Sequence, residues 1–149
     1  MKILFIGDVV GKSGRRALRR FLPELQDANE ADLTVVNAEN AAGGFGVTAG
    51  VLEEFLEQSE IDVLTSGNHI WDKREALDLI QDEPRLLRPH NYPEVTPGSG
   101  WIVATASNGV RVGVLNIMGT VFMHPTLDCP FSSANRAIEK KPSDVHAIL

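Results

Sequence analysis

Three short apolar runs, each ending in polar side chains, place the strongest constraint on what this chain can fold into. The runs are rich in β-branched residues and are separated by helical patterns, which is typical of parallel strands in an α/β sheet. Such sheets bind ligands in the crevice outside the carboxyl ends of their strands. We therefore expect the polar side chains to meet at one rim as a site for hard or borderline cations, which suggests phosphate chemistry. The runs cover residues 2–8, 33–40 and 61–69 and end, in that order, in Asp8, in Glu39 and Asn40, and in Asn68 and His69.

The composition is that of one acidic globular domain. A chain of 149 residues buries roughly 70% of the surface that its unfolded form exposes. Its 43% hydrophobic and 23% charged residues are ordinary values for such a domain. The net charge of −6 argues against binding to duplex nucleic acid, because non-specific duplex binding depends on neutralising phosphates with Lys and Arg.

The sequence also indicates a cellular compartment. No apolar run approaches the ~18 residues of a membrane span, and Met1-Lys2 leads into the first strand without the pattern of a secretory signal. The single cysteine, Cys129, cannot form a disulfide within the chain and fits a reducing environment. We therefore predict a cytoplasmic protein with no membrane partner.

Helical periodicity predicts three helices between and after the strands. They are expected over residues 14–26, 48–59 and 73–81, with Thr48 as the N-cap of the second. The apolar side chains that recur at helical spacing are Leu18, Phe21, Leu22 and Leu25 in the first helix, Val51, Leu52, Phe55 and Leu56 in the second, and Ala76, Leu77 and Ile80 in the third.

The second half of the chain is less regular. Strands are expected over residues 101–106 and 110–117, joined by a two-residue turn at Asn108-Gly109. Residues 119–136 are expected to form a long loop or a short broken helix. Residues 145–149 read as a strand that has just started and has no polar exit residue. We therefore expect the chain to be the N-terminal part of a longer protein.

The candidate site residues also have purely structural interpretations. Asp8 can simply cap the segment after its strand, and residues 43–46 (Gly-Gly-Phe-Gly) fit either a plain turn or a loop that lets backbone approach a ligand. Glu39 and Asn40 favour a site, because polar groups that crowd the end of an apolar strand are costly to bury without a partner. His69 can donate a proton near neutral pH, and it follows an amide that can bind a metal.

Residues 7–13 (Gly-Asp-Val-Val-Gly-Lys-Ser) look like a phosphate-binding P-loop but have the wrong spacing. That motif needs four residues between its glycines, whereas three separate Gly7 from Gly11. Loop size decides which N–H groups point at a phosphate, so we do not expect a P-loop here. A P-loop protein would bind ATP with Mg²⁺ even after Glu39→Ala.

A basic run follows the first strand and fits a solvated helix face. Its first members, Lys12 and Arg15, lie close enough to Asp8 in the sequence to reach an anionic substrate as an alternative, and the others are Arg16, Arg19 and Arg20. Three further histidines lack the spacing of metal ligands and are expected at the surface or in loops, with His124 as a further candidate to line a pocket; the other two are His90 and His146.

Three motifs together resemble the calcineurin-like metallophosphoesterase superfamily, and most closely its bacterial YmdB-like branch. The superfamily combines an Asp near the first strand, an acidic bridging residue and a Gly-Asn-His motif. The matching segments are residues 6–11 (Ile-Gly-Asp-Val-Val-Gly), 37–44 (Asn-Ala-Glu-Asn-Ala-Ala-Gly-Gly) and 65–72 (Thr-Ser-Gly-Asn-His-Ile-Trp-Asp). The resemblance runs in order through the whole chain and implies the N-terminal part of a layered α/β sandwich.

The resemblance also implies an activity and a set of roles. It implies a dinuclear centre, usually of iron or manganese, that hydrolyses phosphate diesters, with 2′,3′-cyclic nucleotides as the favoured substrate class. Asp8 would bind the first metal with Asn40 nearby, Glu39 would bridge both metals, and Asn68 would bind the second. His69 would be the general acid that protonates the leaving alkoxide, so it should not be a ligand, because a metal-bound imidazole nitrogen cannot donate its proton.

The sequence departs from the superfamily pattern in three ways. Val10 stands where the first motif commonly has His, and Glu39 replaces the usual bridging Asp; both are features of the YmdB-like branch. The later histidine motifs, which supply imidazole ligands to both metals, are absent from this chain. We therefore expect half of a metal site, completed in one alternative by a second copy in a homo-oligomer, and exposed apolar surface beside it. The alternative function is a non-catalytic binding or regulatory module.

Overall fold

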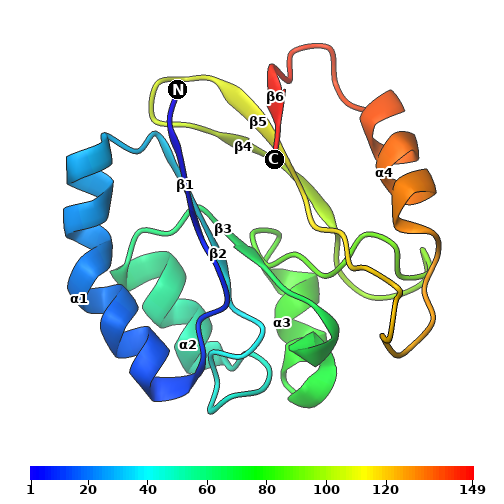
Figure 1. The fold of residues 1–149 in the computed structure, drawn as a ribbon, viewed down its shortest axis with the longest axis horizontal. Coiled ribbons are helices and arrows are strands. Elements are labelled where there is room, and N and C mark those ends of the chain that lie inside the picture. Colours follow the sequence, from blue (N-terminus) through cyan, green and yellow to red (C-terminus); the bar gives the residue numbers. More distant parts are fainter.

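Two three-stranded sheets stack on one another between layers of helices (Figure 1). The structure is a computed structural model that describes residues 1–149. The first sheet is parallel, with the order β1 (Ile3–Ile6), β2 (Leu33–Asn37), β3 (Val63–Thr65). In the second sheet β4 (Trp101–Thr105) pairs antiparallel with β5 (Arg111–Leu115), which pairs parallel with β6 (Ala147–Ile148). The predicted layered α/β sandwich is confirmed.

The helices form the two outer layers. Those that follow the strands of the first sheet pack on its outer side, and the last helix lies beyond the second sheet (Figure 1). The helices on the first sheet are α1 (Gly11–Asn29), α2 (Ala49–Glu53) with its π-helical continuation η1 (Glu54–Gln58), the short 3₁₀ helix η2 (Asn68–Asp72) and α3 (Ala76–Asp82). The last helix is α4 (Pro130–Glu139).

Strand β2 explains how the layers hold together. Its first four residues are all buried. Alternate side chains of a strand point to opposite faces, and both faces of this sheet are covered. Val36 packs in the core between the first sheet and its helices, whereas Leu33 and Val35 pack in the core between the two sheets. The central strand of the first sheet therefore contributes to both cores, and its exit is fixed from both sides.

Helix α1 is longer than the 14–26 predicted. The Gly14 amide already donates to the Val10 carbonyl at 3.0 Å, and the helix ends only where Glu30 adopts a left-handed conformation, a common helix terminus. Leu18 and Leu22 are buried as predicted. Phe21 and Leu25, however, are 53% and 40% exposed, because only one stripe of α1 meets the sheet.

The next two helices agree with the sequence in part. Thr48 caps α2 as predicted: its hydroxyl oxygen accepts a hydrogen bond from the Val51 amide at 3.4 Å. Residues 54–58 are π-helical rather than α-helical, a local widening that periodicity does not indicate. In the third helix Ala76 and Ile80 are buried, but Leu77 is 47% exposed, since the helix begins only at Ala76 and presents a narrower apolar stripe.

The hairpin between β4 and β5 is confirmed, but its connection has three residues rather than two. The Ala106 amide donates to the Val110 carbonyl at 2.9 Å, and the Gly109 amide donates to the Ala106 carbonyl at 2.8 Å. Gly109 has φ +81°. This is a turn followed by a left-handed glycine, the usual geometry of a three-residue loop.

The last part of the chain contains one correction and one confirmation. Residues 119–136 are neither all loop nor a broken helix, because α4 is a regular ten-residue helix from Pro130; proline fits its first turn, where the missing N–H would be unpaired anyway. The strand predicted at 145–149 is present as β6, which pairs Val112 with Ala147.

Apolar side chains are exposed at the edge and end of the sheets, as expected. Phe5 on β1, an edge strand of the first sheet, is 52% exposed, and Leu149 beyond β6 is 40% exposed. Separately, none of the helices combines the length and the apolarity that crossing a bilayer requires.

Candidate metal centre

The exits of the three parallel strands share one rim, and a cavity of about 510 Å³ opens beside it. Asn37 and Glu39 line this cavity from the exit of β2, and residues 65–67 line it from the exit of β3. The segment after β5, including Asn116 and Gly119, forms the opposite wall. Of the five side chains predicted to form the site, Glu39 is the one that lines this cavity.

Asp8 and Asn40 are brought together by the parallel pairing of β1 and β2. The Asn40 side-chain amide donates to the Asp8 carboxylate at 2.8 Å. Backbone bonds hold the two exits in place: the Val9 amide donates to the Asn37 carbonyl at 3.1 Å, and the Gly11 amide to the Asn40 carbonyl at 2.9 Å. Asp8 does not cap α1, since this helix begins without a side-chain cap.

Glu39 lies against the segment that follows β3. Its carboxylate accepts a hydrogen bond from the His69 amide at 3.3 Å. A Cβ at position 67 would lie 2.5 Å and 2.6 Å from the two carboxylate oxygens, so a larger residue at this position would push the Glu39 carboxylate out of its present place. Neither Glu39 nor Asp8 takes part in any ion pair of the chain. Two carboxylates without a cationic partner thus remain at one rim.

His69 is held by two residues to which the sequence assigned no role. Its Nδ1 lies 2.7 Å from the Asp72 carboxylate, and its ring lies 5.1 Å from the Phe45 ring, centroid to centroid. The spacing of His69 and Asp72 by three residues within η2 is the sequence signal for the first contact. The second depends on the glycine-rich segment 43–46, which is a turn and carries Phe45 to the imidazole.

Asn68 is the first residue of η2, next to His69, and its side chain makes no hydrogen bond within the chain. Its amide oxygen is therefore free to bind a ligand. Asn68 thus stands at the exit of β3, directly before His69 in the chain.

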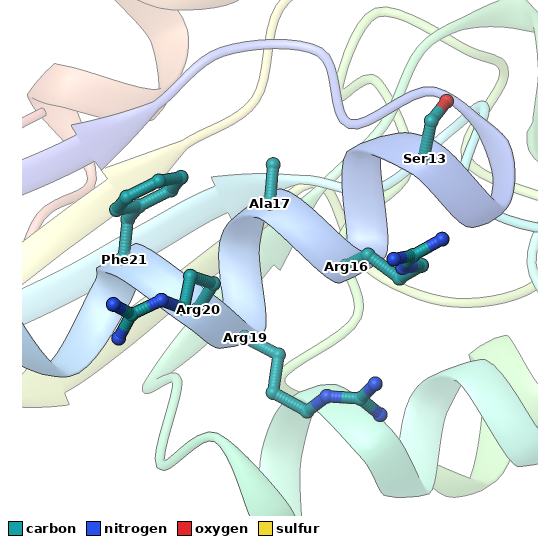
Figure 2. Close-up of a pocket in the computed structure, with 6 residues that line it drawn as sticks. All are labelled: Ser13, Arg16, Ala17, Arg19, Arg20 and Phe21. Atoms are coloured by element: carbon teal, nitrogen blue, oxygen red, sulfur yellow. The ribbon is translucent and has the colours of Figure 1, made fainter.

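The P-loop alternative does not fit the geometry. Backbone amides must be free to bind a phosphate, but those of Val9 and Gly11 donate to the carbonyls of Asn37 and Asn40. Arg15 is also not available to bind an anionic substrate, because it donates to the Glu54 carboxylate at 2.9 Å and to the Ala41 carbonyl at 2.6 Å. The basic run is a helix face, as Figure 2 shows for Arg16, Arg19 and Arg20.

The other histidines follow the sequence expectation with one exception. His124 and His146 are exposed, and His124 lines none of the larger cavities. His90 is partly buried and lines a second cavity, beside α4.

The residues of the rim fit a metal ion that prefers oxygen ligands. Two unpaired carboxylates and two amides are the donors that hard and borderline cations prefer. No three His, Cys, Asp or Glu side chains of this chain gather closely enough to hold a metal by themselves. Asp8 and Glu39 would therefore need the amide oxygens of Asn40 and Asn68, and further ligands, to complete a coordination shell.

The layered fold and the polar rim at its strand exits are those of a phosphoesterase-type α/β sandwich. The chain belongs to the YmdB-like protein family, whose model matches residues 4–149. It is 45% identical over 138 residues to a 2′,3′-cyclic-nucleotide 2′-phosphodiesterase of Bacillus subtilis, covering 93% of this chain and 51% of that protein. It is 30% identical to a putative phosphatase/phosphodiesterase of Mycoplasma genitalium, covering 99% of this chain and 54% of that protein.

Two solved structures share the fold. A hypothetical protein from Thermus thermophilus superposes with a TM-score of 0.86 at 37% identity, over 95% of this chain and 54% of that one. A novel phosphatase from Mycoplasma pneumoniae superposes with a TM-score of 0.87 at 31% identity, over 99% of this chain and 54% of that one. The chain thus spans about half the length of the relatives it matches.

Proposed function

We propose that this chain is the N-terminal part of a metal-dependent phosphodiesterase that hydrolyses small phosphate diesters, with 2′,3′-cyclic nucleotides as the favoured substrate class. The observation that carries the proposal is the position of Glu39, whose unpaired carboxylate faces the Gly67–His69 segment at the strand rim. The names of the Bacillus subtilis and Mycoplasma relatives support the same reaction class.

The rim residues divide into ligands and an acid. Asp8 and Asn40, which already contact each other, would hold one ion of iron or manganese, Asn68 would hold a second, and Glu39 would contribute to both. Such a pair of ions lowers the pKa of a bound water and neutralises charge on a phosphate group. The two carboxylates supply negative charge to this centre, while the two amides add oxygen ligands without adding charge.

His69 is the proton donor of the proposal. Asp72 engages Nδ1, which leaves Nε2 as the atom that gives its proton to the leaving alkoxide when the P–O bond breaks. The attacking water oxygen forms the new P–O bond as the ester P–O bond breaks, and the proton that this water loses passes to solvent, from which His69 is reprotonated. The diester and one water thus become a monoester and an alcohol. The Phe45 ring lies 5.1 Å from the imidazole ring, centroid to centroid.

Metal stoichiometry tests this proposal. The chain is purified without oxygen, exchanged into metal-free buffer and analysed for iron and manganese. We expect two ions per chain in the wild type, with water or a second copy of the chain supplying the further ligands. Glu39→Ala should lose dinuclear binding, because this variant removes the shared carboxylate. Glu53→Ala, an exposed change on α2, is the matched control. Undiminished two-metal occupancy in Glu39→Ala contradicts the proposed site.

One observation favours the second candidate function, a non-catalytic binding or regulatory module. No group of three His, Cys, Asp or Glu side chains is assembled in this chain, so its own ligands form only part of a metal site. This alternative predicts one ion or none per wild-type chain, and no hydrolysis of a 2′,3′-cyclic nucleotide when iron or manganese is added. Two ions together with hydrolysis exclude it.

A further inference from the structure

Phe45 is an exposed aromatic side chain beside the proposed acid. Its ring lies 5.1 Å from the imidazole of His69, centroid to centroid, and the two ring planes are tilted by 60°. The side chain is nevertheless 56% exposed and belongs to neither hydrophobic core. A single exposed apolar residue needs no explanation by itself. The position of this one matters, because the contact with His69 leaves an aromatic surface open at the metal rim.

The turn that carries Phe45 is fixed to the proposed metal ligands. The Glu39 carbonyl accepts a hydrogen bond from the Gly46 amide, and the Asn40 carbonyl accepts one from the Gly44 amide at 3.1 Å. The turn therefore folds back on the two residues whose side chains are proposed to bind metal. Backbone bonds thus place Phe45 between these ligands and the acid.

Gly46 holds the end of the turn against the segment that contains His69. It has φ +75°, a left-handed conformation that favours glycine. A Cβ there would lie 2.7 Å from Lys73 Cγ and 3.3 Å from the His69 carbonyl oxygen. The other side of the turn is open, because a Cβ at either glycine of residues 43–44 would meet no atom within 4 Å. The backbone around Phe45 is therefore closely packed on one side and unobstructed on the other.

The proposed reaction brings a base close to this position. This step rests on the phosphodiesterase function proposed above, in which His69 gives its proton to an oxygen of the ribose. In a 2′,3′-cyclic nucleotide only a few covalent bonds separate that oxygen from the base, so the base must lie near the imidazole. Aromatic side chains bind bases by stacking, and Phe45 is the aromatic ring that lies against His69.

We propose that Phe45 is a specificity-determining residue that binds the nucleobase of the substrate by stacking. A ring whose role is only to pack on His69 has no use for a free aromatic surface, and an aliphatic side chain could replace it. A stacking role depends on the flat π-surface itself. The two roles therefore differ in what they expect of Phe45→Leu.

Phe21 on α1 provides a matched control (Figure 2). It is 53% exposed, almost as much as Phe45, and its ring centroid lies 5.8 Å from the guanidinium carbon of Arg20. A hollow of about 610 Å³ lies beside it, and none of the lining residues belongs to the metal rim. This helix face thus combines an exposed aromatic ring with positive charge, but without the acid.

Binding of two ligands that share a ribose phosphate tests the inference. One is adenosine 3′-monophosphate, and the other is methyl ribofuranoside 3-phosphate, which lacks the base. Both are titrated calorimetrically into the purified chain in saturating manganese. The ratio of the two dissociation constants measures what the base contributes, because changes at the metal or the phosphate affect both ligands alike. The variants are Phe45→Ala, Phe45→Leu, Phe45→Tyr and Phe21→Ala.

We expect the wild type to prefer the nucleotide by about fivefold or more, the usual effect of one base stacked on an aromatic ring. Phe45→Ala and Phe45→Leu should lose most of this preference, whereas their affinity for the ligand without a base should change less than about twofold. Phe45→Tyr should keep the preference, since it keeps the aromatic surface. Phe21→Ala should behave as the wild type.

Three outcomes overturn the inference alone. They are equal affinity of the wild type for both ligands, a preference that survives in Phe45→Leu, and a preference that is lost in Phe21→Ala, which places the nucleotide on α1. In each case the ligand without a base still binds in manganese and is released by EDTA, so the phosphodiesterase proposal stands. Failure of both ligands to bind in manganese overturns that proposal together with the inference.

Discussion

At the scale of single residues, the backbone at Gly67 lies very close to the carboxylate of Glu39. An added methyl group there would meet both carboxylate oxygens of Glu39 within 2.6 Å, which is closer than van der Waals contact allows. Gly67→Ala should therefore displace the Glu39 carboxylate and raise the metal concentration needed for half-saturation by at least about tenfold. Metal titration followed by elemental analysis measures this shift.

Gly50→Ala is the control for that substitution. Nothing lies within 4 Å of a Cβ at Gly50, and the residue belongs to α2, where alanine is a better helix former. Metal binding should be unchanged in this variant. Equal metal affinity in Gly67→Ala and in Gly50→Ala contradicts the close approach of Gly67 to Glu39.

Asp72 should matter for activity but not for metal content. Its carboxylate engages His69 Nδ1 at 2.7 Å and so orients the ring that is proposed to donate the proton. Asp72→Asn should lower kcat for diester hydrolysis about tenfold or more, while the metal content stays at the wild-type level. Asp78→Asn, an exposed change on α3, should have no effect. Loss of metal in Asp72→Asn points instead to a ligand role.

At the scale of elements, the end of α3 is fastened by an ion pair that depends on pH. Arg85 donates through Nε and Nη2 to the two carboxylate oxygens of Glu83, at 2.9 Å and 2.8 Å. These hydrogen bonds hold the pKa of Glu83 below its ordinary value, although burial opposes them. The Arg85 carbonyl in turn accepts from the Leu64 amide of β3 at 2.8 Å. The pair therefore connects α3 to the first sheet.

Glu83→Gln should lower the free energy of unfolding by about 1 kcal/mol at pH 7. Because the folded-state pKa of Glu83 is lowered, its contribution is present above the unfolded-state pKa and is lost as pH falls through the folded-state pKa. The difference between wild type and variant should thus shrink on acidification below the ordinary Glu range. Urea unfolding at several pH values measures it, with the exposed change Glu24→Gln as control; a difference that does not depend on pH contradicts the prediction.

At the scale of the whole molecule, stability depends on the core between the two sheets. Leu87 is fully buried there, and its carbonyl accepts hydrogen bonds from Ser66 and Asn116. Leu87→Ala should reduce the free energy of unfolding by about 2–4 kcal/mol, through lost burial and the cavity left behind. Leu77→Ala, at a position 47% exposed, should cost less than about 1 kcal/mol.

The same experiment shows whether the sheets unfold together. Far-UV circular dichroism reports all helices and strands, whereas Trp101 fluorescence in a Trp71→Phe background reports the second sheet. We expect coincident transitions. Separate transitions, or equal costs for Leu87→Ala and Leu77→Ala, contradict a shared core between the sheets.

Local patterns were sufficient where neighbours in the sequence decide the structure. The strands around β1, β2 and β3, the Thr48 cap and the hairpin depend on alternation, capping and turn residues that lie within a few positions of one another. The convergence of Asp8 with Asn40 was also predictable, because parallel pairing always brings strand exits to one edge. The exposure of Phe21 and Leu77 was not, since periodicity cannot tell how wide a stripe the neighbouring sheet will cover.

The sequence by itself determined the order of strands and helices, the family and the side chains of the rim, because each is written in contiguous residues. Only the tertiary structure decided which groups remain without partners. Asp72 and Phe45 reach His69 through the geometry of their own segments, and the indole Nε1 of Trp71 and the hydroxyl of Tyr92 are left buried without a hydrogen-bond partner. Contacts between distant segments depend on packing, and packing is a property of the folded chain as a whole.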